Sequence, residues 1–220
     1  MSINVIAVDG PAGAGKSAVT QELARRLGID YLNTGAMYRA VVIAAQRQGV
    51  DLTDEESITA VARRAQIESR AGRTYLDGED VTDAVRDAQI SRLVRYSANA
   101  PGVREIMAQL QRAIGQERPI ATEGRDQGTV VFPDARCKFY LTASVEERAR
   151  RRLKELNARG QYEPLQEVQR QILERDRLDM QREVGPLRQP QDAVVIDSSE
   201  LSIEQVVSIM EKIAREKITL

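Results

Sequence analysis

Apolar residues along the chain fall into two kinds of pattern. Short, continuous apolar runs bounded by turn residues are typical of strands buried in a parallel sheet. Five such runs lie at residues 3–9, 29–32, 120–122, 138–141 and 193–197. Between them, apolar residues recur at helical spacing, as Val19, Leu23 and Leu27 do. This alternation predicts an α/β fold with an open, mostly parallel sheet that helices cover on both faces.

The helical stretches also carry signals for where they begin and end. Gly28 is a stop signal for the helix predicted over residues 17–27. Thr53, followed three residues later by Glu56, has the pattern of a capping box and predicts the start of another helix. Further helices are predicted, by the same apolar spacing, at residues 35–48, 87–99, 102–116, 145–159, 165–183 and about 203–213.

Residues 66–81 depart from the α/β pattern. Two short runs, 67–70 and 73–77, are joined by Ala71 and Gly72, which is typical of a hairpin turn. A hairpin pairs antiparallel strands, whereas the core runs predict parallel ones. We therefore expect a small antiparallel insertion carried on the α/β core.

The helix predicted at 145–159 is unusually basic. Ser144 is placed to cap its start and Gly160 to end it. Between Arg148 and Arg159 the chain has six basic residues and one acidic residue, Glu155. On its own, such a run is usually a solvated helix face. Beside a phosphate site it favours a mobile lid, too polar to pack alone, that closes over a polyanion.

Composition narrows the functional classes. The 220 residues carry a net charge of −1 and no Trp, which argues against binding to nucleic-acid polymers. No apolar run approaches the ~18 residues of a membrane span, and the N-terminus lacks a signal-peptide pattern, so we expect a cytoplasmic protein. The single Cys137 cannot form an internal disulfide. The absence of His removes the commonest general base and leaves Lys, Arg, carboxylates and the backbone for chemistry.

A glycine-rich segment directly follows the first predicted strand and directly precedes a helix. It fits the phosphate-loop pattern G-x-x-x-x-G-K-[ST], with the residues Gly10, Pro11, Ala12, Gly13, Ala14, Gly15, Lys16 and Ser17. Glycines let successive backbone N–H groups face one anion, and the helix start adds a partial positive charge. We expect these residues to bind ATP, with Lys16 on its β- and γ-phosphates and the Ser17 hydroxyl on Mg²⁺.

Several classes of protein use such a loop. The chain lacks the guanine-reading N-K-x-D pattern of GTPases. A small chain with many scattered arginines fits a kinase whose two substrates are both polyanions, because fixed cations must hold their phosphates together. The acceptor could be a nucleoside monophosphate or another small molecule such as shikimate. A nucleotide-binding switch that hydrolyses ATP slowly is the alternative from a different class.

Three further segments, at residues 34–39, 123–135 and 174–179, make the chain resemble bacterial cytidylate kinase. They occur in the family's order and span essentially the whole chain, and G-R-D-x-G-T-V-V-F-P within the second is highly specific. The resemblance implies transfer of the γ-phosphoryl group of ATP to CMP or dCMP, giving ADP and CDP or dCDP in pyrimidine nucleotide metabolism. It also implies one domain over residues 1–220, with a monophosphate-binding insertion at about 34–100 and a lid at about 148–165. We expect a monomer.

The resemblance extends to single residues on both substrates. It implies that Thr34 and Arg39 contact the phosphate of CMP and that Tyr38 packs beside it. On the donor side, Arg151 and Arg152 belong to the implied lid over ATP.

A second group is implied to recognise the base. Arg104 and Arg125 read the base edge or the phosphate, and Asp126 orients them. The chain departs from the family at two nearby positions, because Gln127 stands where Met is usual and Arg95 where a base-binding Ser is usual.

A third group belongs to one predicted helix. Arg175 and Asp179 are implied to hold the ribose, and Arg182 to lie between the acceptor and the transferring phosphate. Their spacing of four and three residues places all three on one helical face, where Arg175 and Asp179 could also pair. A surface salt bridge is the alternative interpretation. The residues predicted to take part in catalysis are Lys16, Arg125, Asp126 and Arg182.

Overall fold

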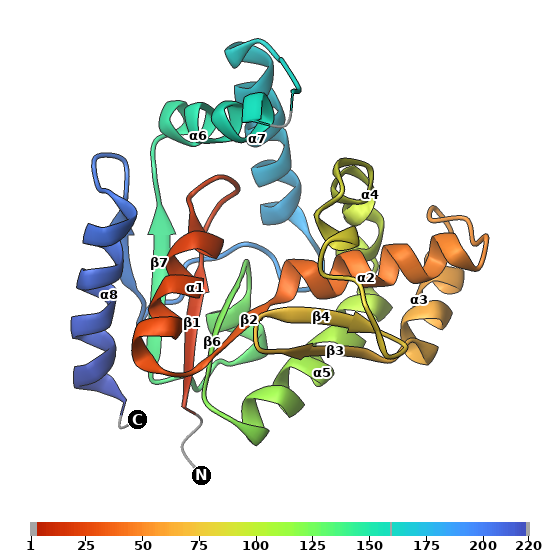
Figure 1. Ribbon diagram of the computed structural model, residues 1–220, viewed down its shortest axis with the longest axis horizontal. Coiled ribbons are helices and arrows are strands. Elements are labelled where there is room, and N and C mark those ends of the chain that lie inside the picture. The colour runs from red at the N-terminus through yellow and green to blue at the C-terminus, as the bar shows by residue number, and fades with distance from the viewer. Residues whose placement is uncertain (1–3, 159, 219–220) are drawn as a thin grey trace.

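The core of the protein is a five-stranded sheet in which neighbouring strands are parallel (Figure 1). The computed structural model describes residues 4–158 and 160–218, so residue 3 of the first predicted run lies outside it. In the order β2-β6-β1-β7-β8, the strands are β2 (Asp30–Asn33), β6 (Ile120–Gly124), β1 (Val5–Asp9), β7 (Cys137–Thr142) and β8 (Val194–Asp197). All five predicted runs are strands, and the predicted α/β class is confirmed.

Helices cover both faces of this sheet, as predicted. The α-helices of the described residues are α1 (Lys16–Leu27), α2 (Thr34–Arg47), α3 (Glu55–Arg64), α4 (Ala88–Asn99), α5 (Pro101–Glu117), α6 (Val145–Ala158), α7 (Leu165–Gln181) and α8 (Ile203–Lys217). In β1, Ile6 and Val8 pack with α1 and α8, whereas Val5 and Ala7 pack with α2 and α5. Because successive side chains of a strand point to opposite faces of the sheet, β1 contributes to two separate apolar layers. Within the residues described, no helix has the length and apolar character needed to cross a membrane.

The helix after residue 53 begins differently from the prediction. The predicted capping box of Thr53 and Glu56 is wrong, because Asp54 is the N-cap residue of α3. Its carboxylate accepts hydrogen bonds from the backbone N–H groups of Glu56 and Ser57, at 3.1 and 3.2 Å. The Thr53 hydroxyl instead donates to Asp51. An aspartate accepts hydrogen bonds from helix N–H groups as well as a threonine does. The sequence pattern therefore cannot tell which of two adjacent residues, Thr53 or Asp54, is the N-cap.

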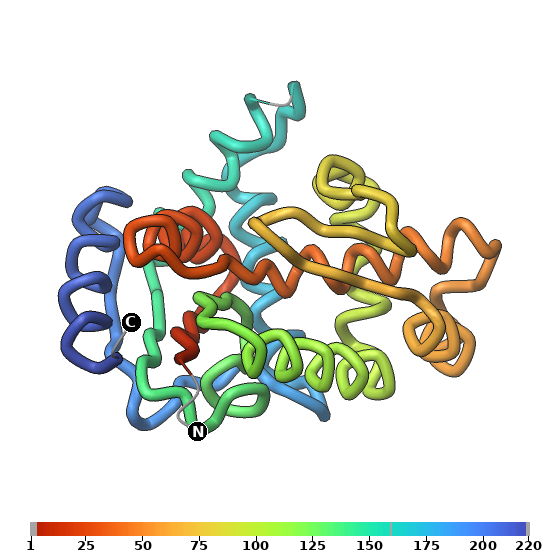
Figure 2. The backbone as a smooth tube through the Cα atoms, turned by 60° about the horizontal axis from the view of Figure 1, so that its bottom comes forward, coloured from red at the N-terminus to blue at the C-terminus, as the bar shows by residue number. Residues whose placement is uncertain are grey.

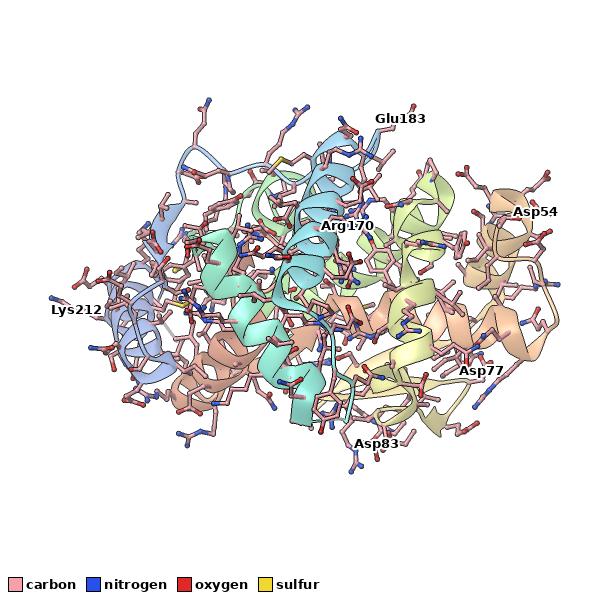
Figure 3. All side chains as sticks on the ribbon, turned by 90° about the horizontal axis from the view of Figure 1, so that it is seen from above. Asp54, Asp77, Asp83, Arg170, Glu183 and Lys212 are labelled. Atoms are coloured by element: carbon pink, nitrogen blue, oxygen red, sulfur yellow. The ribbon has the colours of Figure 1, made fainter. Side chains whose placement is uncertain are left out.

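The antiparallel insertion is present and has one strand more than predicted. The hairpin of β3 (Ile67–Arg70) and β4 (Arg73–Leu76) is confirmed, and β5 (Glu79–Asp80) adds a third strand. This sheet packs against α2 and β2. In Figure 3, Asp54 and Asp77 mark the end of the molecule formed by the insertion and α3, opposite Lys212 on α8.

Helices α6 and α7 lie above the phosphate loop and project from the body of the molecule (Figures 1 and 2). The expectation that this segment is too polar to pack is wrong. Ala149 and Leu156 of α6 form an apolar cluster with Val168 and Ile172 of α7. Basic side chains dominate the sequence of α6, but a single stripe of small and apolar residues is enough to pair two helices. Arg159, the end of the predicted basic run, lies outside the described residues.

Candidate active site

The phosphate loop joins β1 to α1 at the carboxyl end of the sheet. Gly10, Gly13 and Gly15 have φ angles of +150°, +76° and +89°, which side chains disfavour. A Cβ atom at Gly10 would also stand 2.0 Å from the carbonyl oxygen of Leu141. The glycines of the motif are therefore required by the backbone, and they shape the loop as a cradle in front of the α1 N-terminus.

Lys16 lies beneath this cradle. It is 5% exposed, and its Nζ donates to the carbonyl oxygens of Gly10 and Pro11, at 2.8 and 2.7 Å. Burial, together with the nearby charge of Arg125, lowers the pKa of Lys16 to about 7. Phosphate oxygens are stronger acceptors for an ammonium group than these carbonyls, so the lysine is placed to turn to a bound triphosphate.

Asp179 organises two of the predicted arginines. Arg125 donates from Nε to one carboxylate oxygen at 2.6 Å, and Arg182 binds the other. Burial on its own raises the pKa of Asp179, but the positive charges of Arg125 and Arg182 outweigh it and the net shift is downward. The predicted pairing of Asp179 with Arg175 is absent, and the two carboxylate oxygens are bound by Arg125 and Arg182 instead.

Two other arginines have carboxylates within electrostatic range but no direct partner among the described residues. No hydrogen bond or ion pair joins the guanidinium groups of Arg39 and Arg175 to another described residue. Arg39 is half-buried and its Nε is shielded from solvent without a partner, and burial lowers its pKa. Arg175 is exposed, within electrostatic range of Arg125, Arg182 and Arg39. Unpaired guanidinium groups gathered this way favour a bound polyanion.

Arg104 and Asp126, both predicted to recognise the base, form a buried pair. Arg104 and Asp126 form a 2.5 Å ion pair whose side chains are 4% and 9% exposed. Arg104 also donates to the carbonyl oxygen of Ala98 and lies 5.5 Å from the centroid of the Tyr38 ring. Gly185 covers the pair so closely that a Cβ there would stand 2.2 Å from the Asp126 carboxylate. Two of the three residues predicted to recognise the base, Arg104 and Asp126, are thus in direct contact, whereas Arg125 pairs with Asp179.

The sequence prediction missed Asp9, the last residue of β1. Its carboxylate accepts from the backbone N–H groups of Gln127 and Gly128, at 2.9 and 2.7 Å. Those residues begin a π-helical turn, Gln127–Val131, directly after Arg125 and Asp126. Burial raises the pKa of Asp9 to about 6. Asp9 thus holds in place the segment that follows two predicted catalytic residues, Arg125 and Asp126. The sequence did offer a signal for Asp9, because it is a charged residue at the end of a strand predicted to be buried.

The remaining predicted residues fall into two groups. Thr34 donates its hydroxyl hydrogen to the carbonyl oxygen of Glu123, at 2.6 Å, on the acceptor side. Arg151 lies beside the cradle, with Nη1 3.3 Å from the carbonyl oxygen of Ala14. Arg152 instead pairs with Glu155 on the surface, and this ion pair does not bring Arg152 to the phosphate loop.

The two departures from the family pattern differ in placement. Arg95 is exposed and binds only the hydroxyl and ring of its neighbour Tyr96. Gln127 is buried, where its side-chain amide accepts from Thr122 and donates to Gln111. Arg95 is therefore on the surface, while Gln127 belongs to a buried hydrogen-bond network with Thr122 and Gln111.

A glycine cradle over a buried lysine opens onto clustered arginines at the carboxyl ends of parallel strands. This fold and site define a P-loop kinase, a phosphotransferase that uses ATP. The fold resembles that of shikimate kinase from Bacteroides thetaiotaomicron, with a TM-score of 0.51 at 14% identity over 96% of this chain and 98% of that one.

The cytidylate kinase family model matches residues 6–216, and the chain belongs to this family. The cytidylate kinase of Caldanaerobacter subterraneus is 48% identical over 202 residues, which cover 92% of this chain and 90% of that protein. The cytidylate kinase of Pelotomaculum thermopropionicum is 47% identical over 210 residues, or 93% of each chain.

Proposed function

We infer that this chain is an ATP-dependent CMP and dCMP kinase of pyrimidine nucleotide metabolism. It transfers the γ-phosphoryl group of ATP to CMP or dCMP and releases ADP and CDP or dCDP. One observation carries this inference within the cytidylate kinase family. Lys16, under the ATP cradle, is within electrostatic range of Arg125, Arg175 and Asp179, so donor-binding and acceptor-binding groups meet in one cleft.

The chemistry needs position and charge more than acid–base groups. The acceptor phosphate has a second pKa near ~6, so it is already a nucleophile at neutral pH. Its attack on the γ-phosphorus brings two polyanions together, which fixed cations must offset. Lys16 holds the β- and γ-phosphates, Arg39 and Arg125 hold the acceptor phosphate with the hydroxyl of Thr34, and Arg182 faces the transferring group. The unpaired guanidinium of Arg39 supports its share of this role.

The nucleoside is held by the rest of the cleft. Arg104 and Asp126 recognise the base beside the Tyr38 ring, while Arg175 and Asp179 bind the ribose. The buried Arg104–Asp126 pair supports the first role, since a desolvated donor and acceptor in fixed positions select one base edge. Arg151, beside the carbonyl oxygen of Ala14, is proposed to complete the ATP side, and Arg152 would have to leave Glu155 to join it.

We further propose Mg²⁺ as the metal that accompanies ATP. Ser17 is exposed at the start of α1, next to Lys16, and its hydroxyl is the hard oxygen ligand that Mg²⁺ takes together with nucleotide phosphates. The metal supplies charge stabilisation between the β- and γ-phosphates. The proposal also includes a cytoplasmic monomer that acts on free nucleotides, not on nucleic-acid polymers.

An ADP-release assay across the common nucleoside monophosphates tests the function. We expect CMP and dCMP to be the best acceptors and UMP to be clearly poorer. Cytosine N4 is a donor where uracil O4 is an acceptor, so a site built for one leaves a polar group unpaired with the other. Such a mismatch costs about 1–3 kcal/mol. That difference corresponds to roughly 5- to 150-fold in kcat/KM.

The variant Asp126→Asn sharpens this assay. An asparagine presents a donor as well as an acceptor, so the ratio of kcat/KM for CMP to that for UMP should move toward one. Equal kcat/KM for CMP and UMP in the wild-type protein would contradict the assignment of the acceptor. A preference for shikimate, or no acceptor-dependent ADP release, would favour the other classes.

We also propose that residues 1–220 form one domain with two functional segments. The monophosphate-binding insertion occupies about 34–100, and a lid at about 148–165 closes over ATP. The position of α6 and α7 above the phosphate loop supports the lid (Figure 1).

Hydrogen exchange measured by mass spectrometry tests the lid. Amides across residues 148–158 should exchange markedly more slowly when a non-hydrolysable ATP analogue and CMP are both bound. Bound phosphates neutralise basic side chains of α6 and hold the helix against the loop. The amides of α8, which packs with α1 on one face of the sheet, serve as the control. Unchanged exchange across α6 would exclude closure of this segment.

A further inference from the structure

A buried ion pair joins helices α6 and α7 to each other outside the groups that face the substrates. Arg148 of α6 and Asp176 of α7 form this pair, with only 6% and 8% of their side chains exposed. Arg148 also donates from Nε to the carbonyl oxygen of Ala143, at 3.0 Å. A buried pair of charges is costly unless its remaining hydrogen-bonding positions are filled, so the other contacts of these two residues are informative.

Those other contacts converge on one residue of the phosphate loop. The backbone N–H of Ala12 donates to Asp176 Oδ1 at 2.9 Å, and Arg148 Nη1 donates to the carbonyl oxygen of Ala12 at 2.9 Å. At the next residue, a Cβ on Gly13 would stand 3.1 Å from both the Cβ and the carbonyl oxygen of Arg148. The first turn of α6 therefore lies directly against the loop, and both backbone groups of Ala12 are bound.

The position of Asp176 along α7 connects this contact to the acceptor. Asp176 follows Arg175 and precedes Asp179 by less than one helical turn. Asp179 in turn holds Arg125 and Arg182. One rigid turn of helix thus carries the acceptor-facing groups and the carboxylate that binds the ATP loop.

We propose that Arg148 and Asp176 are positioning residues that hold Ala12 in the loop shape that receives ATP. Through α7 they also couple binding of the acceptor to binding of the donor. The second statement rests on the proposed function, since it takes α7 as the acceptor-facing helix. A coupling of this kind is a free energy shared between two sites, so it is measurable from either one.

The test is calorimetric binding of ADP to the full chain, with and without saturating CMP. ADP is chosen because it lacks the γ-phosphate, so direct repulsion between the two ligands is small. In the wild-type protein, CMP should tighten ADP binding about fivefold or more. In Asp176→Asn, ADP should bind at least about tenfold more weakly, and the effect of CMP should fall below about twofold, while the Kd of CMP alone stays unchanged.

Further variants separate this role from general stability. Arg148→Lys keeps the charge of the pair but cannot donate to Ala12, Ala143 and Asp176 together, so it should reproduce the loss of coupling even if Asp176→Asn fails to fold. Combining both substitutions should weaken ADP binding no more than the stronger single substitution does, because the two residues act as one unit. Glu174→Gln, exposed on another face of α7, is the matched control and should behave as the wild type does.

Each outcome bears on the proposal. If both variants retain wild-type ADP affinity and the same effect of CMP, the proposal is overturned. Equal losses of ADP and CMP affinity together with a lower Tm would also overturn it, since they indicate a purely structural pair. If the wild type releases no ADP with any nucleoside monophosphate, the proposed function fails instead. The dependence of ADP affinity on Asp176 and Arg148 still decides the loop half of the inference.

Discussion

Replacing Lys16 with alanine should lower kcat for ADP release with CMP by roughly 10²- to 10³-fold, with the fold retained. The ammonium group meets negative charge that shifts from the transferring phosphoryl group to the leaving ADP, so it stabilises the transition state more than the ground state. Burial of Lys16 lowers its pKa to about 7, which means that the folded protein disfavours the charged form until phosphate arrives. Removing the side chain therefore costs the empty protein little.

The measurement pairs steady-state kinetics with thermal unfolding. Lys16→Ala should unfold within a few degrees of the wild type, whereas its turnover should nearly vanish. Lys212→Ala removes an exposed lysine on α8, at the opposite end of the molecule from Asp54, and is the matched control (Figure 3). A folded Lys16→Ala protein with near wild-type kcat would refute the assignment of the phosphate loop.

The fold could be predicted because its signals are local. Each core strand is a short apolar run, and the phosphate loop needs glycines that a sequence pattern can show. Gly10 illustrates this, since a side chain there would collide with the carbonyl oxygen of Leu141. Where several local solutions compete, the pattern failed, as with Asp54 in place of Thr53 at the start of α3. Neighbouring polar residues compete for the same N–H groups, and only geometry decides between them.

Much of the candidate site could be predicted only from the resemblance to a known family. The hydrogen bonds between residues far apart in the sequence could not be predicted at all. Asp9 lies 118 positions from the N–H group of Gln127 that it accepts from, and Arg148 lies 136 positions from Ala12. No periodicity links residues so far apart. Spacing along α7 predicted that Asp179 pairs with an arginine, and Asp179 does bind two, Arg125 and Arg182. It wrongly suggested Arg175 as the partner of Asp179, because the competing arginines lie just after β6 and just after α7.

Arg182 was predicted to continue the helical face of Arg175 and Asp179, and here the structure changes the reason for its position. Helix α7 ends at Gln181, and Arg182 has non-helical dihedral angles, φ −56° and ψ 139°. Its guanidinium nevertheless binds Asp179, and its Nε donates to the side chain of Asn99 at 2.9 Å. The guanidinium of Arg182 is therefore held by two partners from different helices, Asp179 of α7 and Asn99 of α4.

This placement predicts that Arg182→Ala lowers kcat by roughly 10²-fold or more, because a charge on the transferring group matters most at the transition state. Asp179→Ala should instead raise KM for CMP more than KM for ATP, since it removes ribose contacts made in the ground state. It also releases Arg125 and Arg182, so some loss of kcat accompanies the rise.

Arg177 provides the control for both variants, because it lies on the same helix and pairs on the surface with Glu174. An exposed pair of this kind contributes about 0.3–0.5 kcal/mol to stability, and Arg177→Ala should leave kcat and both KM values close to wild type. Steady-state kinetics with CMP and ATP varied separately distinguishes the three variants. If Arg182→Ala and Arg177→Ala have the same small effect, the end of α7 is only a solvated surface. The split between kcat and KM decides whether Asp179 serves the ribose, as proposed, or only holds the two arginines in place.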